Sequence, residues 1–351
     1  HVAKSRNDQV ATAIRIALRT RLLEVIQILV ELRKTFLARC DEYFEALMPG
    51  YTHLQHAQPT TIAHYLLAYH DALKRDTERL MDAYSRVNLS PMGAGALATT
   101  SFKIDRKLVA ELLGFDGLLE NSVDAVSARD FVVEVLADLA LIMIDLSRFS
   151  EEIVLWSTSE FSAVELPDEY VSTSSIMPQK RNPVVAELIR AKTANVYGDL
   201  MAVLTILKAL PLSYNLDLQE VTPHLWSACE VTLSSLKMAV GLLKGLKFDS
   251  QRWFESVSRD FSTATELADM LVREHNLAFR TAHAIVGKLV YKMISEGKER
   301  KDLTPEMLSA AVSEATGAEI QIDKEKFLKA LDPLESVKVK NRVGGPSPKE
   351  V

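Results

Sequence analysis

Cysteine, glycine and proline are scarce in this chain, and each scarcity excludes a class of protein. The two cysteines, Cys40 and Cys229, cannot build a disulfide framework or a multi-thiolate metal site. They are typical of a reducing compartment, so we expect a cytoplasmic protein. With only 13 glycines and 12 prolines among 351 residues, and 48% hydrophobic residues, the chain is suited to a large buried core and not to disorder.

Excess positive charge and long apolar runs are also lacking. The net charge of −6 shows no excess of Lys and Arg of the kind that nucleic-acid binding needs. The most apolar stretch, residues 131–146, carries Glu134, Asp138 and Asp145. We therefore expect a buried helix there and no membrane span.

What the sequence does have is helical periodicity. From Val10 onward, apolar residues recur near the helical period until Pro49-Gly50, which predicts one helix of about 35 residues, about 50 Å long. Similar runs cover residues 59–87, 127–161, 183–210 and 223–243. We predict an all-α protein whose first domain, residues 1–244, is an elongated bundle of about five long helices. These helices are hydrophobic over more than one face, as expected if bundles from several subunits pack together.

The remaining residues, 245–351, have shorter and more charged helical runs, including 262–274 and 279–295. We predict a small helical domain there, ending in a loose tail at residues 343–351. Strand signals are almost absent from the whole chain.

One polar segment, Ser172-Thr-Ser-Ser-Ile-Met-Pro-Gln-Lys-Arg-Asn-Pro183, has the composition of an anion-binding loop. Asn182 could cap a helix that Pro183 begins, which would place Lys180 beside free N–H groups that favour an anion. An ordinary polar loop with a helix cap would have the same composition. However, the segment resembles the signature of the fumarase/aspartase superfamily, whose members release fumarate by β-elimination.

A second polar segment, residues 50–59, lies between two predicted long helices. Four of the eight histidines fall between His53 and His70, which leaves a metal site as an alternative, although no His-Glu-x-x-His pair is present. Solvated loop histidines are the ordinary alternative. The run Thr52-His53-Leu54-Gln55 resembles the second signature of the superfamily, in which the first histidine is catalytic. His53 is therefore the candidate, and His56 is expected to be a bystander.

A third segment, Ser5-Arg6-Asn7-Asp8-Gln9, precedes the first long helix and would by itself be a capped helix entry. It resembles the Ser-Arg-Asn-Asp-Gln motif of argininosuccinate lyases, and residues 210–220 resemble that family's Tyr-Asn-x-Asp-Leu-Gln-Glu stretch. Similar segments also stand at residues 91–97, 121–127 and 129–130. The resemblance runs from His1 to about Glu220, and more weakly over residues 265–288.

The resemblance implies a homotetramer that cleaves argininosuccinate into arginine and fumarate without a metal or organic cofactor, in active sites shared between subunits. It implies that Ser174 is the base and that Lys180 stabilises the carbanion. His53 would protonate the departing nitrogen, and Glu187 would orient His53. Implied substrate-binding residues are Ser5, Arg6, Asn7, Thr52, Asn182, Tyr214 and Gln219.

Two residues depart from the family pattern. Thr173 replaces the usual glycine and is expected to stiffen the loop, because threonine resists positive φ. Thr222 stands where many of these lyases have a lysine near the distal end of the substrate, so the resemblance does not supply that contact. The small N-terminal domain of the family is also not seen, apart from its end at His1.

Two other functions stay open at this point. The first is another fumarate-releasing lyase, such as adenylosuccinate lyase, against which the segment Tyr214–Glu220 argues. The second is a catalytically silent structural protein of the crystallin type, against which the intact catalytic residues argue.

Overall fold

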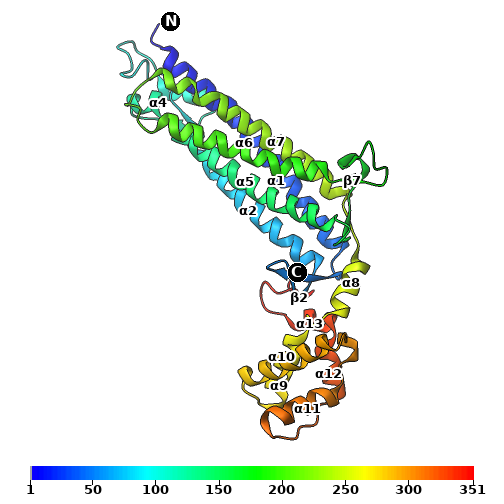
Figure 1. Ribbon diagram of the computed structural model, residues 1–351. Coiled ribbons are helices and arrows are strands. Elements are labelled where there is room, and N and C mark those ends of the chain that lie inside the picture. The colour runs from blue at the N-terminus through cyan, green and yellow to red at the C-terminus, as the bar shows by residue number, and fades with distance from the viewer. Residues whose placement is uncertain (1) are drawn as a thin grey trace. The chain divides into compact units, whose positions relative to one another are not determined.

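The computed structural model describes residues 2–351, and within them it contains thirteen α-helices. The contacts divide the chain into two units, which we describe separately (Figure 1). The first contains the chain up to residue 36 together with residues 69–158 and 166–247, and the second contains residues 37–68, 159–165 and 248–351. The division into domains at residues 244 and 245 stays a prediction. His1, where the resemblance placed the end of a further domain, lies outside the described residues.

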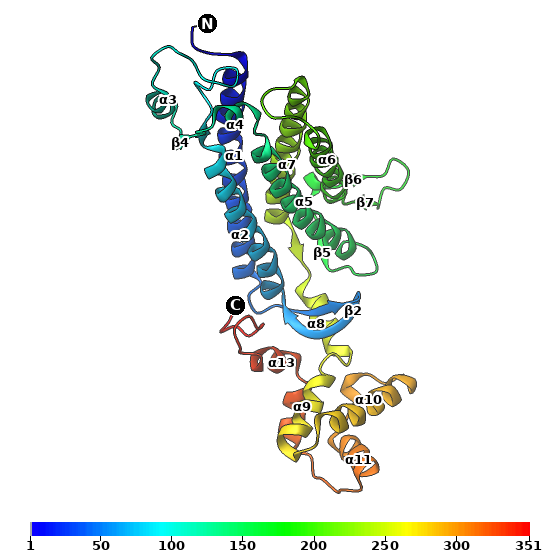
Figure 2. The ribbon, with the colours of Figure 1, turned by 90° about the vertical axis from the view of Figure 1, so that its left-hand side faces the viewer.

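Long helices make up the first unit, as predicted, and Figure 2 shows them side by side. They are α1 (Arg6–Glu42), α2 (Ile62–Val87), α5 (Asp130–Trp156), α6 (Val184–Leu207) and α7 (Val221–Gly245), of which α1 and α2 continue into the second unit. Together they confirm the all-α fold class.

The interior of this bundle follows the apolar periodicity of the sequence. Leu18, Leu22 and Leu29 of α1 are fully buried. The aromatic ring of Phe36 packs 6.0 Å from Tyr69 of α2 and 5.1 Å from Phe149 of α5, measured between ring centroids. The apolar stretch within α5 is a buried helix, as expected. None of the helices in residues 2–351 is both long and apolar enough to span a membrane.

Short elements connect the long helices. They are β3 (Leu89–Ser90), α3 (Arg106–Leu112), β4 (Gly117–Leu118), α4 (Ser122–Ser127), β5 (Val164–Glu165), η1 (Asp168–Tyr170), β6 (Ser172–Thr173), β7 (Arg181–Asn182), η2 (Leu216–Gln219) and β8 (Lys247–Phe248), where η denotes a 3-10 helix. Strand β3 pairs in parallel with β4. The predicted helix 127–161 is shorter than expected, because α4 ends at Ser127 before α5 begins at Asp130.

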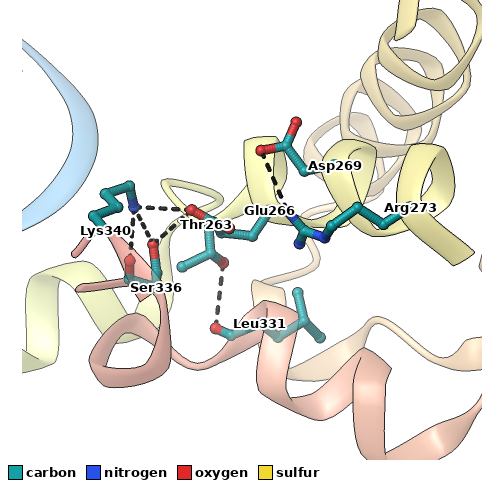
Figure 3. A network of polar contacts seen from close by, with 7 residues as sticks. All are labelled: Thr263, Glu266, Asp269, Arg273, Leu331, Ser336 and Lys340. Atoms are coloured by element: carbon teal, nitrogen blue, oxygen red, sulfur yellow. Dashed lines mark hydrogen bonds and ion pairs between the residues drawn. The ribbon is translucent and has the colours of Figure 1, made fainter. Parts of the chain in front are cut away.

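The second unit contains the predicted small helices. They are α8 (Ser250–Arg259), α9 (Ala264–His275), α10 (Phe279–Ser295), η3 (Arg300–Asp302), α11 (Pro305–Thr316), α12 (Lys324–Leu331) and α13 (Pro333–Val339). Figure 3 shows how α9 is joined to α13: the Lys340 ammonium group lies 2.8 Å from a carboxylate oxygen of Glu266 and donates a 2.6 Å hydrogen bond to Ser336 Oγ. Nearby, Thr263 Oγ1 donates to the carbonyl of Leu331 at the end of α12.

A β-hairpin in the second unit was not predicted. Strands β1 (Leu47–Thr52) and β2 (Gln55–Thr61) pair antiparallel, so α2 begins at Ile62 and not at Pro59. Little in the sequence indicated this hairpin, because Pro49, Gly50 and Pro59 are poor strand residues. The ladder accommodates them through an irregularity between Pro49 and Tyr51.

The prediction of a loose tail at residues 343–351 was wrong. The carbonyl of Gly344 lies 3.0 Å from His64 Nε2, and Gly345 N donates a hydrogen bond to the carbonyl of Arg342. Ser347 is buried. A glycine- and proline-rich sequence does not show a partner that lies 280 residues away.

Candidate active site

The loop that carries Ser174 and Lys180 is closed by a short pair of strands. Ser172 pairs with Asn182 and Thr173 pairs with Arg181 in the β6–β7 ladder. The prediction that Asn182 caps the next helix was wrong, because Pro183 occupies the N-cap position and no side chain bonds to the free N–H groups there. Asn182 instead pairs with Ser172 in the β6–β7 ladder.

Ser174 has a specific environment within this loop. Its Oγ accepts hydrogen bonds from the backbone N–H groups of Ile176, at 3.2 Å, and Met177, at 3.1 Å. Two converging N–H donors favour negative charge on the oxygen that they contact. The sequence could not show this arrangement, which gives Ser174 a means of stabilising its alkoxide form.

Thr173 fits the loop without strain. It lies in an extended strand and is not among the non-glycine residues with positive φ. The glycine that usually stands here is therefore not required by this backbone. The base of the loop is fixed by Arg181, which donates a 2.8 Å hydrogen bond to the carbonyl of Leu166 and forms an ion pair with Asp168.

Glu187 and Lys180 are both exposed beside this loop. Glu187 lies in the first turn of α6, where a carboxylate is favoured by the helix dipole. Neither side chain has an ion-pair partner among residues 2–351. Both are therefore available to a ligand or to another subunit.

His53 lies at the tip of the β-hairpin, where Thr52 pairs with Gln55. His53 and Leu54 have φ angles of 55° and 57°, the geometry of a two-residue type I′ turn. This turn strongly prefers asparagine and glycine, so a His-Leu pair there is strained. The side chain of His53 is exposed, and it has no hydrogen-bond partner within the described part of the chain.

His56 makes a contact of its own. Its Nδ1 lies 2.5 Å from Oδ2 of Asp260, and its ring packs 5.2 Å from that of Tyr51. Burial opposes ionisation of Asp260, but hydrogen bonds from His56 and Ser262 outweigh it and lower the pKa of the carboxyl group. Burial, with Asp260 nearby, raises the pKa of Tyr51 to about 12, so its hydroxyl stays protonated.

The other two histidines of this segment point to different partners. His64 Nδ1 lies 2.8 Å from Thr60 Oγ1, and His70 Nδ1 lies 3.0 Å from a carboxylate oxygen of Asp71. Within residues 2–351, no group of three or more histidine, cysteine, aspartate or glutamate side chains is arranged to hold a metal ion.

The segment at the start of α1 is organised by Asp8, a residue to which the sequence assigned no role. Ser5 Oγ accepts a hydrogen bond from Asn7 N, and Asp8 Oδ1 accepts one from Ser5 N. The fully buried Asp8 also accepts hydrogen bonds from the N–H groups of Gly93 and Gly95 through Oδ2. One carboxylate thus joins two of the segments that resemble the family.

Tyr214 and Gln219 lie together, with Gln219 Nε2 donating a 2.7 Å hydrogen bond to the Tyr214 hydroxyl. Burial lowers the pKa of Arg129, and Tyr214 is close enough to oppose that effect, which places this pair beside the start of α5. The start of α1 lies at the same end of the bundle, because the Arg15 guanidinium stacks 3.9 Å from the ring of Phe131.

The candidate residues of the first unit therefore form two groups at opposite ends of its helices (Figure 1). Ser5, Asn7, Tyr214 and Gln219 lie at one end, and the Ser174 loop lies at the other. Helix α6, with 24 residues, separates them by about 36 Å. The structure brings members of each group together but does not bring the two groups to each other.

Comparisons with known proteins show which families match this chain. The lyase family matches residues 1–198, and the argininosuccinate lyase C-terminal family matches residues 261–338. The argininosuccinate lyase of Methanocaldococcus jannaschii is 51% identical over all of this chain and 71% of that protein. The argininosuccinate lyase of Methanothermobacter thermautotrophicus is 50% identical over all of this chain and 75% of that protein.

Solved structures show the same fold. An EDDS lyase in complex with formate has a TM-score of 0.94 and 32% identity, covering all of this chain and 70% of that chain. A class II fumarase from Schistosoma mansoni shares the fold, with a TM-score of 0.78 and 19% identity over 95% of this chain and 71% of that chain. Since the curated relatives match the whole chain at about half identity and name one enzyme, the chain belongs to the argininosuccinate lyase family.

Proposed function

We propose that this protein is a lyase that cleaves argininosuccinate into arginine and fumarate by general acid–base β-elimination. Family membership supports the reaction, and the observation that supports the mechanism most directly is the pair of N–H groups that bond to Ser174 Oγ. A serine is a poor base unless its alkoxide is stabilised. These two donors supply that stabilisation.

In the proposed reaction, Ser174 removes a proton from the carbon next to a carboxylate of the substrate. The electron pair left on that carbon makes the intermediate a carbanion with added negative charge, which a nearby cation and helix N–H groups stabilise. We assign that task to Lys180 and to the uncapped start of α6. The electron pair then forms the carbon–carbon double bond of fumarate as the bond to the guanidino nitrogen breaks.

Protonation of the departing nitrogen completes the reaction. We assign this proton to His53, since an imidazole is suited to proton transfer near neutral pH. Glu187 would orient His53 and hold its tautomer. The reaction needs no metal or organic cofactor.

Substrate binding is assigned to polar groups from three segments. Ser5, Arg6 and Asn7 lie at the start of α1, at the same end of the bundle as the hydrogen-bonded pair Tyr214 and Gln219. Thr52 and Asn182 flank His53 and the Ser174 loop in the sequence. These assignments follow the family resemblance.

The same geometry supports a homotetramer with shared active sites. Groups that lie about 36 Å apart in one bundle can meet around one substrate only if different subunits contribute them. Helix α6 also exposes an apolar face that a second copy would cover, since Leu188 is 50% and Met201 63% exposed. We place the enzyme in the cytoplasm, where its two buried thiols would remain reduced, with neither nucleic acid nor a membrane as partner.

The test is an absorbance assay for fumarate with argininosuccinate, adenylosuccinate and malate as separate substrates. Release from argininosuccinate alone would support the proposal. Release from adenylosuccinate at a higher kcat/KM, or no release from any substrate, would contradict it.

A further inference from the structure

The outer part of the His53 hairpin lacks support of its own. The ladder is interrupted at Gly50, where an added Cβ would lie 2.7 Å from the carbonyl oxygen of Gln58. Beyond this point only two pairs remain, Tyr51 with His56 and Thr52 with Gln55. A two-stranded ribbon is marginally stable in water, and this one ends in a strained turn.

Apolar packing holds the base of the hairpin and, beyond Gly50, extends only to Tyr51, whose ring centroid lies 5.9 Å from that of Phe161. Leu47, the first residue of β1, packs in a buried cluster with Val257 of α8 and Val337 of α13. The two paired residues nearest the tip, Thr52 and Gln55, are both exposed. A further contact is therefore needed to fix the direction of the tip.

Asp260 provides a rigid point of attachment. Asp260 is the C-cap residue of α8, a helix that buries Trp253 and Val257. Its Oδ1 atom accepts a 2.9 Å hydrogen bond from Ser262 N. The preceding turn is held by Arg300, whose Nε donates a 2.9 Å hydrogen bond to the carbonyl of Ser258. The other carboxylate oxygen of Asp260 is the one that contacts His56, three residues from His53.

We propose that Asp260 is a positioning residue for the elimination reaction: through its contact with His56, it fixes the outer hairpin and so the place of His53. The proposal rests on the assigned role of His53. Asp260 acts on the hairpin and not on the substrate, and His56 becomes a structural link instead of a bystander. Because a misplacement of about 1 Å can cost about a hundredfold in rate, such a link can control turnover.

The test uses variants of the full-length protein that change Asp260 or His56, the two residues of the contact. We expect Asp260→Ala and His56→Leu each to lower kcat at least about tenfold while KM changes less than about twofold, since tip placement matters most in the transition state. The double variant should be no slower than the slower single variant, because both remove one interaction. His56→Arg, which can still donate to Asp260, should recover most of the turnover.

Asp269→Ala is the matched control, because Asp269 forms an ion pair with Arg273 at 4.0 Å within α9 (Figure 3) and makes no hydrogen bond to His56 or Asp260. It should leave kcat within about twofold of wild type, as expected for an exposed pair. Unchanged kcat in Asp260→Ala, or a double variant that multiplies the losses of the single variants, would overturn the proposal.

Hydrogen exchange of residues 47–61, followed by mass spectrometry, gives a readout that does not depend on activity. Exchange should be faster in Asp260→Ala and His56→Leu than in Asp269→Ala, when each variant is measured at the same interval below its own melting temperature. Equal exchange rates would overturn the structural link. If the link holds while wild-type protein releases no fumarate from argininosuccinate, the proposed function fails and the link stands.

Discussion

The Ser174 loop and the His53 hairpin are both exposed polar turns that carry a proposed catalytic residue, yet they are stabilised differently. The loop is closed by its own strands, and Ser174 is bonded by N–H groups two and three residues further along the chain. The hairpin has a strained tip and depends on Asp260, 204 residues from its partner His56. Local contacts therefore prepare the proposed base, and long-range contacts place the proposed acid.

The largest expected effect comes from removing groups inside the loop. Ser174→Ala and Lys180→Met should each lower kcat at least about a hundredfold, the scale for losing a positioned acid–base or charge-stabilising group. Folding should change little, because both side chains lie on a polar surface loop. Fumarate release measures the loss of kcat, and circular dichroism checks that folding is little changed.

Ser227→Ala, on the exposed surface of α7, is a suitable control and should keep near-normal turnover. If Ser174→Ala also kept near-normal turnover, Ser174 could not be the base. The loop would then carry no catalytic residue to compare with His53 of the hairpin.

A smaller effect is expected from Gly50→Ala in the hairpin. The new Cβ would meet the backbone of Gln58, so the irregular ladder must shift. We expect a loss of about 1–3 kcal/mol in the free energy of unfolding and a drop in kcat of about tenfold through displacement of His53. Chemical denaturation and fumarate release measure these effects.

Gly287→Ala in α10 is the matched glycine control, because an added Cβ there meets no atom within 4 Å. It should raise stability by about 0.5–1 kcal/mol, since alanine favours the helix. If Gly50→Ala behaved in the same way, the hairpin would be less constrained than its geometry indicates.

The smallest effect is expected at Thr173. Thr173→Gly restores the residue usual in the family, but the extended backbone has no need of it. We expect stability to fall by about 0.5–1 kcal/mol and kcat to stay within about threefold, because glycine adds freedom to the unfolded chain. Thr173→Val, which keeps the branched shape, should match wild type, and a tenfold gain for glycine would show that loop stiffness limits turnover.

The same contrast explains what the sequence could predict. Helical periodicity predicted the five long helices, and α10 matched its predicted bounds, because these patterns are local. The hairpin at residues 47–61 was missed, because its strands are irregular and rich in poor strand formers. The anchored tail was missed because its partner His64 is distant in the sequence.

The candidate site shows the same limit. Local motifs singled out Ser174, Lys180 and His53, but no local pattern pointed to the N–H groups around Ser174 Oγ. The same holds for Asp8, which joins two segments 85 residues apart. Asp260 carried no signal at all, since only the folded chain brings it to His56.

We propose that, in each shared active site, the Ser174 loop comes from one subunit and the His53 hairpin from another. The direct measurement starts from His53→Asn and Ser174→Ala variants, each nearly inactive, which are mixed equally, unfolded and reassembled. If each site draws its histidine and serine from different chains, both are intact in about one half times one half of the sites, so about a quarter of wild-type activity should return. If hybrid tetramers are verified and activity stays at the level of the two parents, the shared site is contradicted.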